Sequence, residues 1–393
     1  MYNSNRRCKF FPAGRGASLH ALRRGALLVA LALLAGCETA GYYTQAATGQ
    51  LRILVARKPI DKVVAAPATS PKLQKQLRLV QEVRAYAHAE LQLPVGDAYG
   101  TYVKLAEKYP VWNVLAAPEF SLKPKRWCYP FVGCASYRGY FSKAAASAKG
   151  KQLLAQGYDV YLGPVPAYST LGWFDDPILS SFVNWTPERL AGLLFHELAH
   201  RRVYISGDTQ FNESFATAVS QLALPDWRRR YSIDSGAANR SAQALAVNHL
   251  MLAARRRLAG VYRAQISDGE KRARKAAALG QLRACYRQLS ADWDHPERYR
   301  YYIDKTNNAT LALVAEYQSQ VPAFRQLYRE SGSWPAFYDA AEQLGNMDKK
   351  ARKQRLAELA AADQTSSKKV TGPSFNSDTC MSAANTPQAT GAN

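Results

Sequence analysis

Cysteine, long apolar runs and acidic side chains are all scarce in this sequence. The 393 residues include six cysteines, and none of the four that follow residue 100 belongs to a Cys-x-x-Cys pair or has a histidine nearby, which argues against a cysteine-based metal site. The longest continuous apolar run, 26–36, is too short to span a bilayer with margin. Hydrophobic residues still make up 47% of the chain, so we expect a globular protein.

Acidic residues are outnumbered by basic ones, 30 against 52, which gives a formal net charge of +22. Such an excess can indicate a nucleic-acid-binding protein. The basic residues, however, cluster on predicted helices, as at 255–257 and 271–275, and no nucleic-acid-binding module is recognisable. We therefore expect no nucleic acid partner, and we interpret the charge as solvated helix faces or attraction to an anionic envelope surface.

The N-terminal segment has the pattern of an export signal. Six basic residues and no acidic one precede the apolar run, which ends in L-A-G-C at Cys37. This ending resembles the lipobox of bacterial lipoproteins, and the resemblance implies cleavage before Cys37 and acylation of that cysteine, with Glu38 favouring the outer membrane. Two or three acyl chains would anchor the protein stably. We expect a lipoprotein signal peptide over 1–36 and a lipid-anchored protein of the bacterial envelope facing the periplasm; a soluble secreted protein is the alternative.

The rest of the chain predicts one folded domain. We interpret 37–69 as a tether, 70–363 as the domain and 364–393, rich in Ser, Thr, Asn and Gly, as a disordered tail unless Cys380 holds it. Helical patterns alternate with a small sheet expected within 98–141 and 157–170, so the predicted fold class is α+β and predominantly helical. Helical patterns begin near residues 70, 186 and 209; an antiparallel helix pair is expected within 240–290, and further helices over 307–319 and 334–362.

Four cysteines remain after the signal and the proposed lipid site. In an oxidising compartment, the short segment C-Y-P-F-V-G-C makes a disulfide between Cys128 and Cys134 plausible. The pairing of Cys285 with Cys380 follows only by subtraction and stays open.

The stretch H-E-L-A-H carries the strongest chemical signal. His196 and His200 are four residues apart on a helix that begins at Thr186-Pro187-Glu188, so their side chains share one face. Two imidazoles at this spacing can hold one zinc ion, with Glu197 placed to activate a water molecule. Exposed histidines on an ordinary helix are the alternative. Glu213, in the next predicted helix, supplies the third ligand that a catalytic zinc site needs.

The second helix strengthens a resemblance to the gluzincin metallopeptidases, in which His-Glu-x-x-His is followed by Asn-Glu-x-x-Ala; this chain has N-E-S-F-A at 212–216. More closely, the chain resembles the putative aminopeptidase family of bacterial lipoproteins, through V-W-N-V-L-A-A-P-E, Y-R-G-Y-F, A-Y-S-T-L-G-W-F-D-D-P and N-N-A-T-L as well. The resemblance implies a gluzincin-like core, Zn²⁺ as cofactor and a peptide substrate. Glu197 would accept a proton from water and pass it to the leaving amine. The interval between His200 and Glu213 is shorter than in better-known gluzincins.

Several further roles have more than one candidate. Thr217 and Asp208 are candidates for orienting the imidazoles, although Asp208 fits a helix N-cap equally well. The candidate oxyanion donors are Tyr317, Tyr168 and His295, each of which packing or solvation also explains. An aminopeptidase needs a carboxylate for the substrate amine, and the candidates are Glu119, Asp175 and Asp176, of which the last two also fit a turn before Pro177. The segment 165–172 is our candidate for an edge strand that aligns the peptide.

The sequence favours a zinc metallopeptidase, with an aminopeptidase as the first choice. The alternatives are an envelope endopeptidase of protein quality control and a non-catalytic outer-membrane lipoprotein. Glu197 argues against the last, because a purely structural zinc site has no use for a general base. Neither the substrate nor the oligomeric state follows from the sequence.

Overall fold

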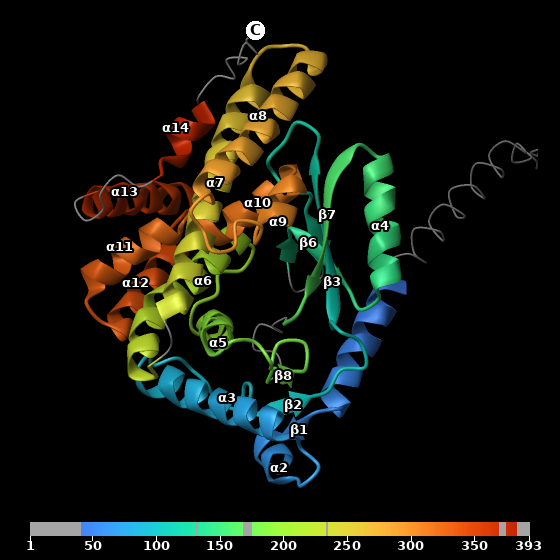
Figure 1. The fold of residues 1–393 in the computed structure, drawn as a ribbon, viewed down its shortest axis with the longest axis vertical. Helices are drawn as coiled ribbons and strands as arrows, with labels where there is room; N and C mark the ends of the chain where they lie inside the picture. The colour runs from blue at the N-terminus through green and yellow to red at the C-terminus, as the bar shows by residue number, and fades with distance from the viewer. Residues whose placement is uncertain (1–40, 130–132, 168–174, 233–234, 369–374, 383–393) are drawn as a thin grey trace, which may run out of the picture. The chain divides into compact units, whose positions relative to one another are not determined.

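The computed structural model describes residues 41–129, 133–167, 175–232, 235–368 and 375–382 (Figure 1). The chain divides into two compact units, Met1–Leu51 and Arg52–Asn393. The described part of the first unit is helical, and every element named below belongs to the second. The described residues are mostly helical with small sheets, which agrees with the predicted α+β class. None of the described helices is both long and apolar enough to cross a membrane.

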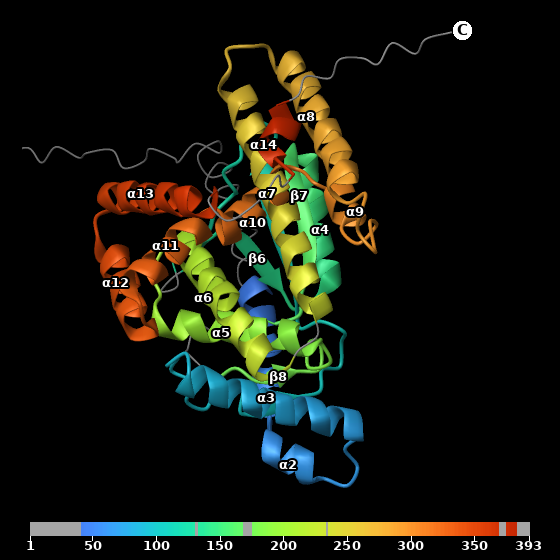
Figure 2. The ribbon, with the colours of Figure 1, turned by 60° about the vertical axis from the view of Figure 1, so that its left-hand side comes forward.

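The sheet with the longest strands is antiparallel and has the order β6-β3-β7. Its strands are β6 (Tyr137–Tyr140), β3 (Val111–Pro118) and β7 (Tyr158–Val165). Residues 114–117 of the central strand are buried because helices cover both faces. Figures 1 and 2 show α4 (Lys143–Ala155) on one side of this sheet and α10 (Asn308–Gln318) on the other. The predicted small sheet is confirmed in both sequence segments.

Two smaller β structures accompany this sheet. In the sheet β1-β2-β8, β1 (Lys58–Pro59) is antiparallel and β8 (Ile178–Leu179) is parallel to β2 (Thr101–Val103). The hairpin of β4 (Trp127–Tyr129) and β5 (Gly133–Ala135) carries a disulfide between Cys128 and Cys134, whose sulfur atoms are 1.97 Å apart.

The larger of two hydrophobic clusters lies among α3 (Pro71–Ala89), α5 (Pro187–Arg202), α6 (Thr209–Arg230), α11 (Val321–Ser331) and α12 (Trp334–Asn346). It is rich in fully buried aromatic side chains, namely Phe195, Phe211, Phe215, Phe324, Phe337 and Trp227. Rigid rings packed on several sides fix the relative positions of the helices they join. The helices that carry the histidines and Glu213 therefore rest on a cluster of fully buried aromatic side chains.

The smaller hydrophobic cluster lies mainly among α7 (Ser235–Arg263), α8 (Asp268–Leu289), α9 (Arg300–Asp304) and α14 (Ser377–Ser382). The predicted helix pair within 240–290 is confirmed as α7 and α8, and the Ser267 side chain caps the second helix. The predicted helix over 334–362 is instead two helices, α12 and α13 (Lys349–Lys368). The cause is Asp348, whose carboxylate accepts hydrogen bonds from the backbone N–H groups of Lys350 and Ala351 and so starts α13.

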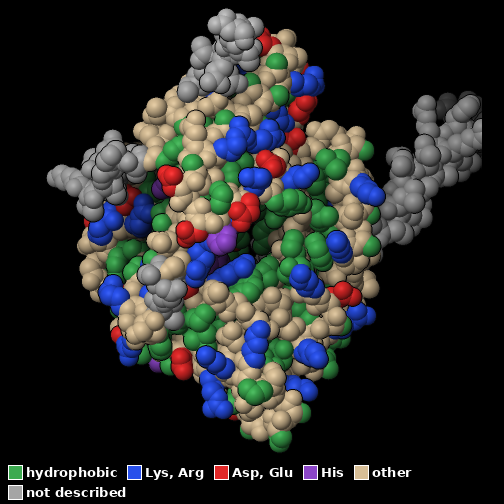
Figure 3. Space-filling model, viewed as in Figure 1, with side chains coloured by type: hydrophobic (Ala, Val, Ile, Leu, Met, Phe, Trp, Pro, Cys, Tyr) green, Lys and Arg blue, Asp and Glu red, His purple; other side chains and the backbone are tan. Residues whose placement is uncertain are grey.

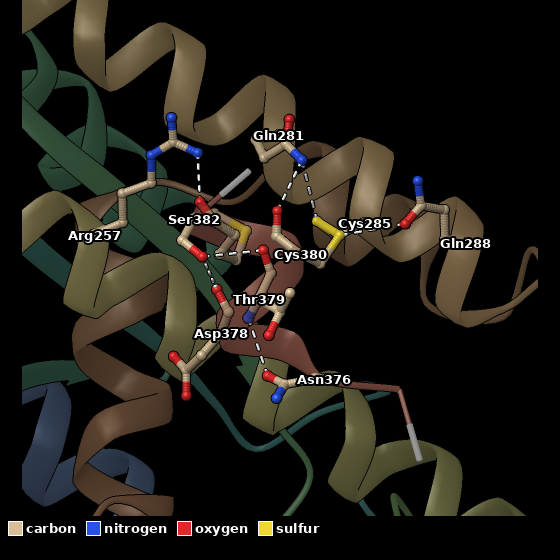
Figure 4. The surroundings of a disulfide bond; sticks show 10 residues. Arg257, Gln281, Cys285, Gln288, Asn376, Asp378, Thr379, Cys380 and Ser382 are labelled. Atoms are coloured by element: carbon tan, nitrogen blue, oxygen red, sulfur yellow. Dashed lines mark hydrogen bonds between the residues drawn. A yellow bond between two sulfur atoms is a disulfide. The ribbon is translucent and has the colours of Figure 1, made fainter. Parts of the chain in front are cut away.

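Two predicted boundaries differ from the structure. The segment expected to be a tether, 37–69, includes β1 and α2 (Ile60–Ala65), and Ile60 is only 2% exposed. The segment 364–393, expected to be a disordered tail unless Cys380 holds it, includes the end of α13 and all of α14. A disulfide joins Cys380 on α14 to Cys285 on α8, 95 residues earlier (Figure 4). Composition alone predicts disorder here, but a covalent bond to a folded helix overrides it.

Candidate metal centre and active site

Helices α5 and α6 bring three potential metal ligands together. The two helices are antiparallel neighbours, since Glu188 pairs with Arg228 at one end and His196 meets Glu213 further along. Nε2 of His196 lies 3.2 Å from Nε2 of His200 and 3.2 Å from Oε2 of Glu213. Nε2 of His200 lies 3.6 Å from the same carboxylate oxygen. Among the described residues, this is the one group of His, Cys, Asp and Glu side chains with the spacing of a metal site.

The shape of this triangle provides a test of whether zinc fits. Ligand atoms about 2.05 Å from a tetrahedral ion lie about 3.3 Å apart, and the three observed edges are 3.2, 3.2 and 3.6 Å. Two imidazole nitrogens and one carboxylate oxygen are also a standard donor set for catalytic zinc. The side chains of His196 and Glu213 stay 15% and 13% exposed, so the centre is reachable from solvent. The residues present fit a zinc ion.

The local sequence explains why the two helices meet at this place. Leu190, Leu194 and Leu198 are fully buried and hold α5 against the larger hydrophobic cluster, which leaves the histidines on the other side of the helix. The turn between the helices is short, and Gly207 has a φ of 77°, a conformation that favours glycine. Such a turn allows the 13-residue interval between His200 and Glu213.

Asn212, the residue before the third ligand, fixes the same turn. Its side-chain carbonyl accepts a hydrogen bond from the N–H of Ile205, and its amide donates to the Ile205 carbonyl, both at 2.8 Å. Asn212 is 2% exposed, so these two bonds replace any contact with water. The asparagine of N-E-S-F-A therefore positions Glu213 by locking the turn that precedes its helix.

The charges at the centre depend on one another. Burial would raise the pKa of Glu213, but the charge of His200 and hydrogen bonds from both histidines lower it overall. Burial raises the pKa of Glu197; the charges of His196 and His200 oppose this, and those of Glu213 and Asp176 add to it. Glu213 is thus held as a carboxylate, which suits a metal ligand, whereas Glu197 has more affinity for a proton, which suits a general base.

Two tyrosines adjoin the histidines. The ring of Tyr317, on α10, stacks on His196 with centroids 5.9 Å apart and planes inclined by 17°. Tyr137 begins β6, and burial followed by the charges of Glu213 and Glu197 raises its pKa. Burial and then the charge of Glu213 likewise raise the pKa of Tyr317. The sequence had identified Tyr317 but not Tyr137, whose segment Y-R-G-Y-F indicated only a strand.

The other candidate oxyanion donors were Tyr168 and His295. Tyr168 lies outside the described residues. His295 is largely exposed and pairs with Glu297 at 3.4 Å.

A partly buried carboxyl group that sequence reasoning missed is that of Glu316, the residue before Tyr317 on α10. Glu316 accepts a hydrogen bond of 2.8 Å from the hydroxyl of Ser136, which precedes β6. Burial, together with the charge of Glu213, raises the pKa of Glu316 to about 7. The hydroxyl of Ser214 donates to the backbone carbonyl of Glu316 at 2.8 Å, so α10 is fastened to α6 directly beside Glu213.

The candidates for orienting the imidazoles have other contacts. Asp208 caps α6 by accepting from the N–H of Phe211 and also pairs with Arg352 at 2.8 Å. Thr217 is buried one turn after Glu213, but no hydrogen bond joins it to either imidazole among the described residues. Nδ1 of His200 is buried, and no described residue forms a hydrogen bond with it. Asp208 is therefore a helix cap, the alternative that the sequence had left open.

The three candidates for binding a substrate amine are separated by the structure. Glu119 forms a two-pronged ion pair with Arg272, at 2.7 and 2.9 Å. Asp175 pairs with Arg201 at 3.3 Å. Asp176 is 7% exposed, and its charge acts on Glu197. Only Asp176 thus adjoins the centre, and it does so from a buried position.

Tyr99 accompanies Asp176 at this end of the centre. Its backbone has a φ of 59°, which is strained for a bulky residue, and its N–H donates to the Asp176 carbonyl at 2.7 Å. Burial, followed by the charges of Glu197 and Asp176, raises the pKa of its phenol. Its segment, G-D-A-Y-G, had no periodic or motif signal from which this position could have been found.

A space-filling view shows how the centre is reached. A histidine surface lies at the edge of a hollow, with acidic and basic side chains on the rim and hydrophobic side chains inside (Figure 3). A hollow of this kind can bind the apolar and polar parts of a peptide together.

Comparison with known proteins gives one match. The model of a family described as "Putative aminopeptidase" matches residues 41–356. No curated protein and no solved structure matches the chain.

Proposed function

The chain belongs to the putative aminopeptidase family, and from that premise we propose that it is a zinc-dependent peptidase, with aminopeptidase action as the first choice. Zinc dependence is supported mainly by the triangle of candidate ligand atoms, whose edges measure 3.2, 3.2 and 3.6 Å. His196, His200 and Glu213 would hold the ion. The antiparallel pair α5 and α6 also agrees with the gluzincin-like core expected from the two motifs.

Zinc, when bound, would polarise the scissile carbonyl and make water a better nucleophile at neutral pH. The remaining work falls to residues of the chain. Glu197 follows His196 directly and has a pKa raised by burial, so it can accept a proton from the attacking water and deliver it to the leaving amine.

The tyrosines would stabilise the negative charge that develops on the carbonyl oxygen. Tyr317 stacks on His196, and the charge of Glu213 acts on both Tyr317 and Tyr137. Their raised pKa values keep both phenols protonated at neutral pH, so each can donate a hydrogen bond. We assign the donor role to Tyr317 first and to Tyr137 second.

Strand β6 is the better candidate for aligning a peptide. It is an edge strand in the described part of its sheet, paired with β3 alone, and it begins at Tyr137 beside the centre. An extended peptide can add to such an edge by backbone hydrogen bonds. The candidate from the sequence, 165–172, is described only as far as Ala167, and β7 already ends at Val165.

We also propose the envelope location expected from the lipobox, with a signal peptide over 1–36 and an acylated Cys37, both outside the described residues. Two disulfides, Cys128–Cys134 and Cys285–Cys380, support an oxidising compartment. Mass analysis of the mature N-terminus would test this location, because acylation at Cys37 adds a defined lipid mass.

The decisive experiment compares the wild type with Glu197→Gln. Zinc content is measured by elemental analysis, and cleavage is measured on peptides with a free and with an acetylated N-terminus. We expect one zinc per chain in both proteins and cleavage by the wild type alone. Glu330→Gln is the matched control, because Glu330 is exposed and its partners among the described residues are two surface residues, Arg355 and Gln326. A folded wild type that binds no zinc would refute the proposal, and cleavage of acetylated peptides alone would favour the endopeptidase.

A further inference from the structure

Among the described residues, two acidic side chains at the candidate centre are neither metal ligands nor assigned a role above. One is Asp176, which is buried, and the other is Glu316. Its charge acts on Tyr137 and Tyr317, and the charge of Glu213 acts on it in turn. The hydrogen bonds of Glu316 locate it: Ser136, which precedes β6, donates to its carboxylate, and Ser214, which follows Glu213 on α6, donates to its backbone carbonyl, each at 2.8 Å.

The hydrogen bonds of this carboxyl group leave one oxygen available. Oε2 accepts from Ser136, and among the described residues Oε1 accepts no hydrogen bond and no lysine or arginine pairs with either oxygen. Glu119 and Asp175 differ, since each already has an arginine partner. Arg126 influences Glu316 only from a distance, because its guanidinium donates to the carbonyls of Cys134 and Gly207.

The surroundings hold Glu316 in a fixed place. The Ser214 hydroxyl binds its backbone carbonyl, and Gln210 on α6 binds Ser319 one turn further along α10. Ser136 lies just after β5, whose hairpin is closed by the Cys128–Cys134 disulfide. Arg126 at the base of this hairpin reaches Gly207 in the turn between α5 and α6 at 3.4 Å. Through Arg126 and Ser136, the hairpin therefore connects the turn between α5 and α6 with Glu316 on α10.

We propose that Glu316, positioned by Ser136, is the carboxylate that binds a cationic group of the substrate beside the scissile bond. The shared chemistry is an ammonium or guanidinium group, supplied either by the N-terminus of a peptide or by a lysine or arginine side chain. This inference rests on the proposed peptidase function. It replaces Glu119 and Asp175 in the amine-binding role, since both of these are already neutralised.

The raised pKa of Glu316 is consistent with this role. A buried carboxylate without a cationic partner holds its proton more firmly, and a bound cation reverses that effect. The group is therefore prepared for a positive charge, and no lysine or arginine among the described residues pairs with it.

The test begins with binding to metal-free protein, so that it does not depend on catalysis. The probes are leucinamide, N-acetyl-leucinamide and N-acetyl-lysinamide, and their affinities are measured by NMR titration after treatment with a chelator. We expect leucinamide to bind the wild type and to bind Glu316→Gln about tenfold more weakly or worse, with no change for N-acetyl-leucinamide. If the weakened probe is N-acetyl-lysinamide instead, Glu316 recognises a basic side chain.

Two further variants keep the result interpretable. Ser136→Ala should weaken the same probe by a smaller factor, because it removes the hydrogen bond but leaves the charge. Glu119→Gln is the control and should change nothing. If Glu316→Gln does not fold, Glu316→Asp shortens the side chain while keeping the charge and should also weaken binding.

Equal affinity of all probes for the wild type and the variants would overturn the proposal, as would a wild type that binds neither leucinamide nor N-acetyl-lysinamide. The same variants are then assayed with zinc. A larger loss of kcat/KM for free than for acetylated peptides in Glu316→Gln agrees with the proposal. Failure of the peptidase function would appear separately, as absence of cleavage in the wild type despite probe binding.

Discussion

The two hydrophobic clusters of this protein are held together in different ways. Around α5, α6, α11 and α12, aromatic side chains pack against one another, as Phe215 does against Phe324, Phe337 and Tyr338. Around α7, α8 and α14, the contacts include a disulfide, an exposed ion pair between Arg256 and Asp378, and a single deeply buried side chain of α14, Met381. The candidate metal centre rests on the first region, where its geometry depends on packing, whereas the attachment of α14 in the second region includes covalent and polar links.

The largest effect we expect concerns chemistry in the first region. Glu197→Gln removes the proposed general base without changing side-chain size and should lower kcat by about 10³-fold. Zinc content and the thermal midpoint should stay near the wild-type values, because Glu197 is not one of the three ligands. Steady-state kinetics, elemental analysis and a thermal melt together check this. A fall in zinc content would show that Glu197 supports the metal site as well.

The next effect concerns the second region. Cys380→Ser opens a loop of 95 residues and should lower the free energy of unfolding by about 4.7 kcal/mol, according to the chain-entropy account of disulfides. The expected consequence is local: α14 is released from α8, but zinc content is unchanged. Urea titration and elemental analysis of the variant would show it.

The matched variant for that comparison is Cys134→Ser. Its loop spans only six residues, so the same account gives a loss of about 2 kcal/mol. Its hairpin, however, adjoins Ser136 and Glu316, so this variant should affect substrate affinity more than Cys380→Ser does. If Cys380→Ser were instead the one that altered KM, the two regions would be coupled through α10, which packs against α7.

A third effect tests whether one polar residue can be as important as packing in the first region. Asn212→Ala leaves the N–H and carbonyl of Ile205 without their partners in a buried turn and should cost about 2 kcal/mol of stability. Because the turn precedes Glu213, zinc affinity should fall with it. A competition titration with a chelator measures the zinc affinity. Asn307→Ala is the control: it removes the side-chain cap of α10 and tests the general effect of losing an asparagine that binds backbone groups.

These contrasts also show what the sequence could predict. The spacing of His196, Glu197 and His200 follows from helix geometry alone, and the asparagine-glutamate motif indicated the partner helix, so the grouping of the three candidate ligands was predictable. The helical pattern and the small sheet were predictable for the same reason, since each repeats within one element. Local periodicity contains this information.

Residues brought together by distant segments were not predictable. Tyr137, Glu316 and Tyr99 come from a strand, a helix and a turn far apart in the chain, and each looked ordinary in its own segment. Glu119 failed for the opposite reason: its position in a family-like segment suggested a role, but Arg272, more than 150 residues later, neutralises it. Which charges are paired is a property of tertiary structure, and the sequence does not show it.

The smallest effect we expect is that of Arg256→Ala. Its guanidinium pairs with Asp378 on α14, but both side chains are more than half exposed, at 58% and 67%. Water screens such a pair, so the variant should lose no more than about 0.5 kcal/mol while the disulfide is intact. In the Cys380→Ser background the same change should cost more, because the ion pair would then be a larger share of what holds α14. Urea titrations of the four proteins form a double-mutant cycle, and strict additivity would show that the disulfide and the ion pair hold α14 independently of each other.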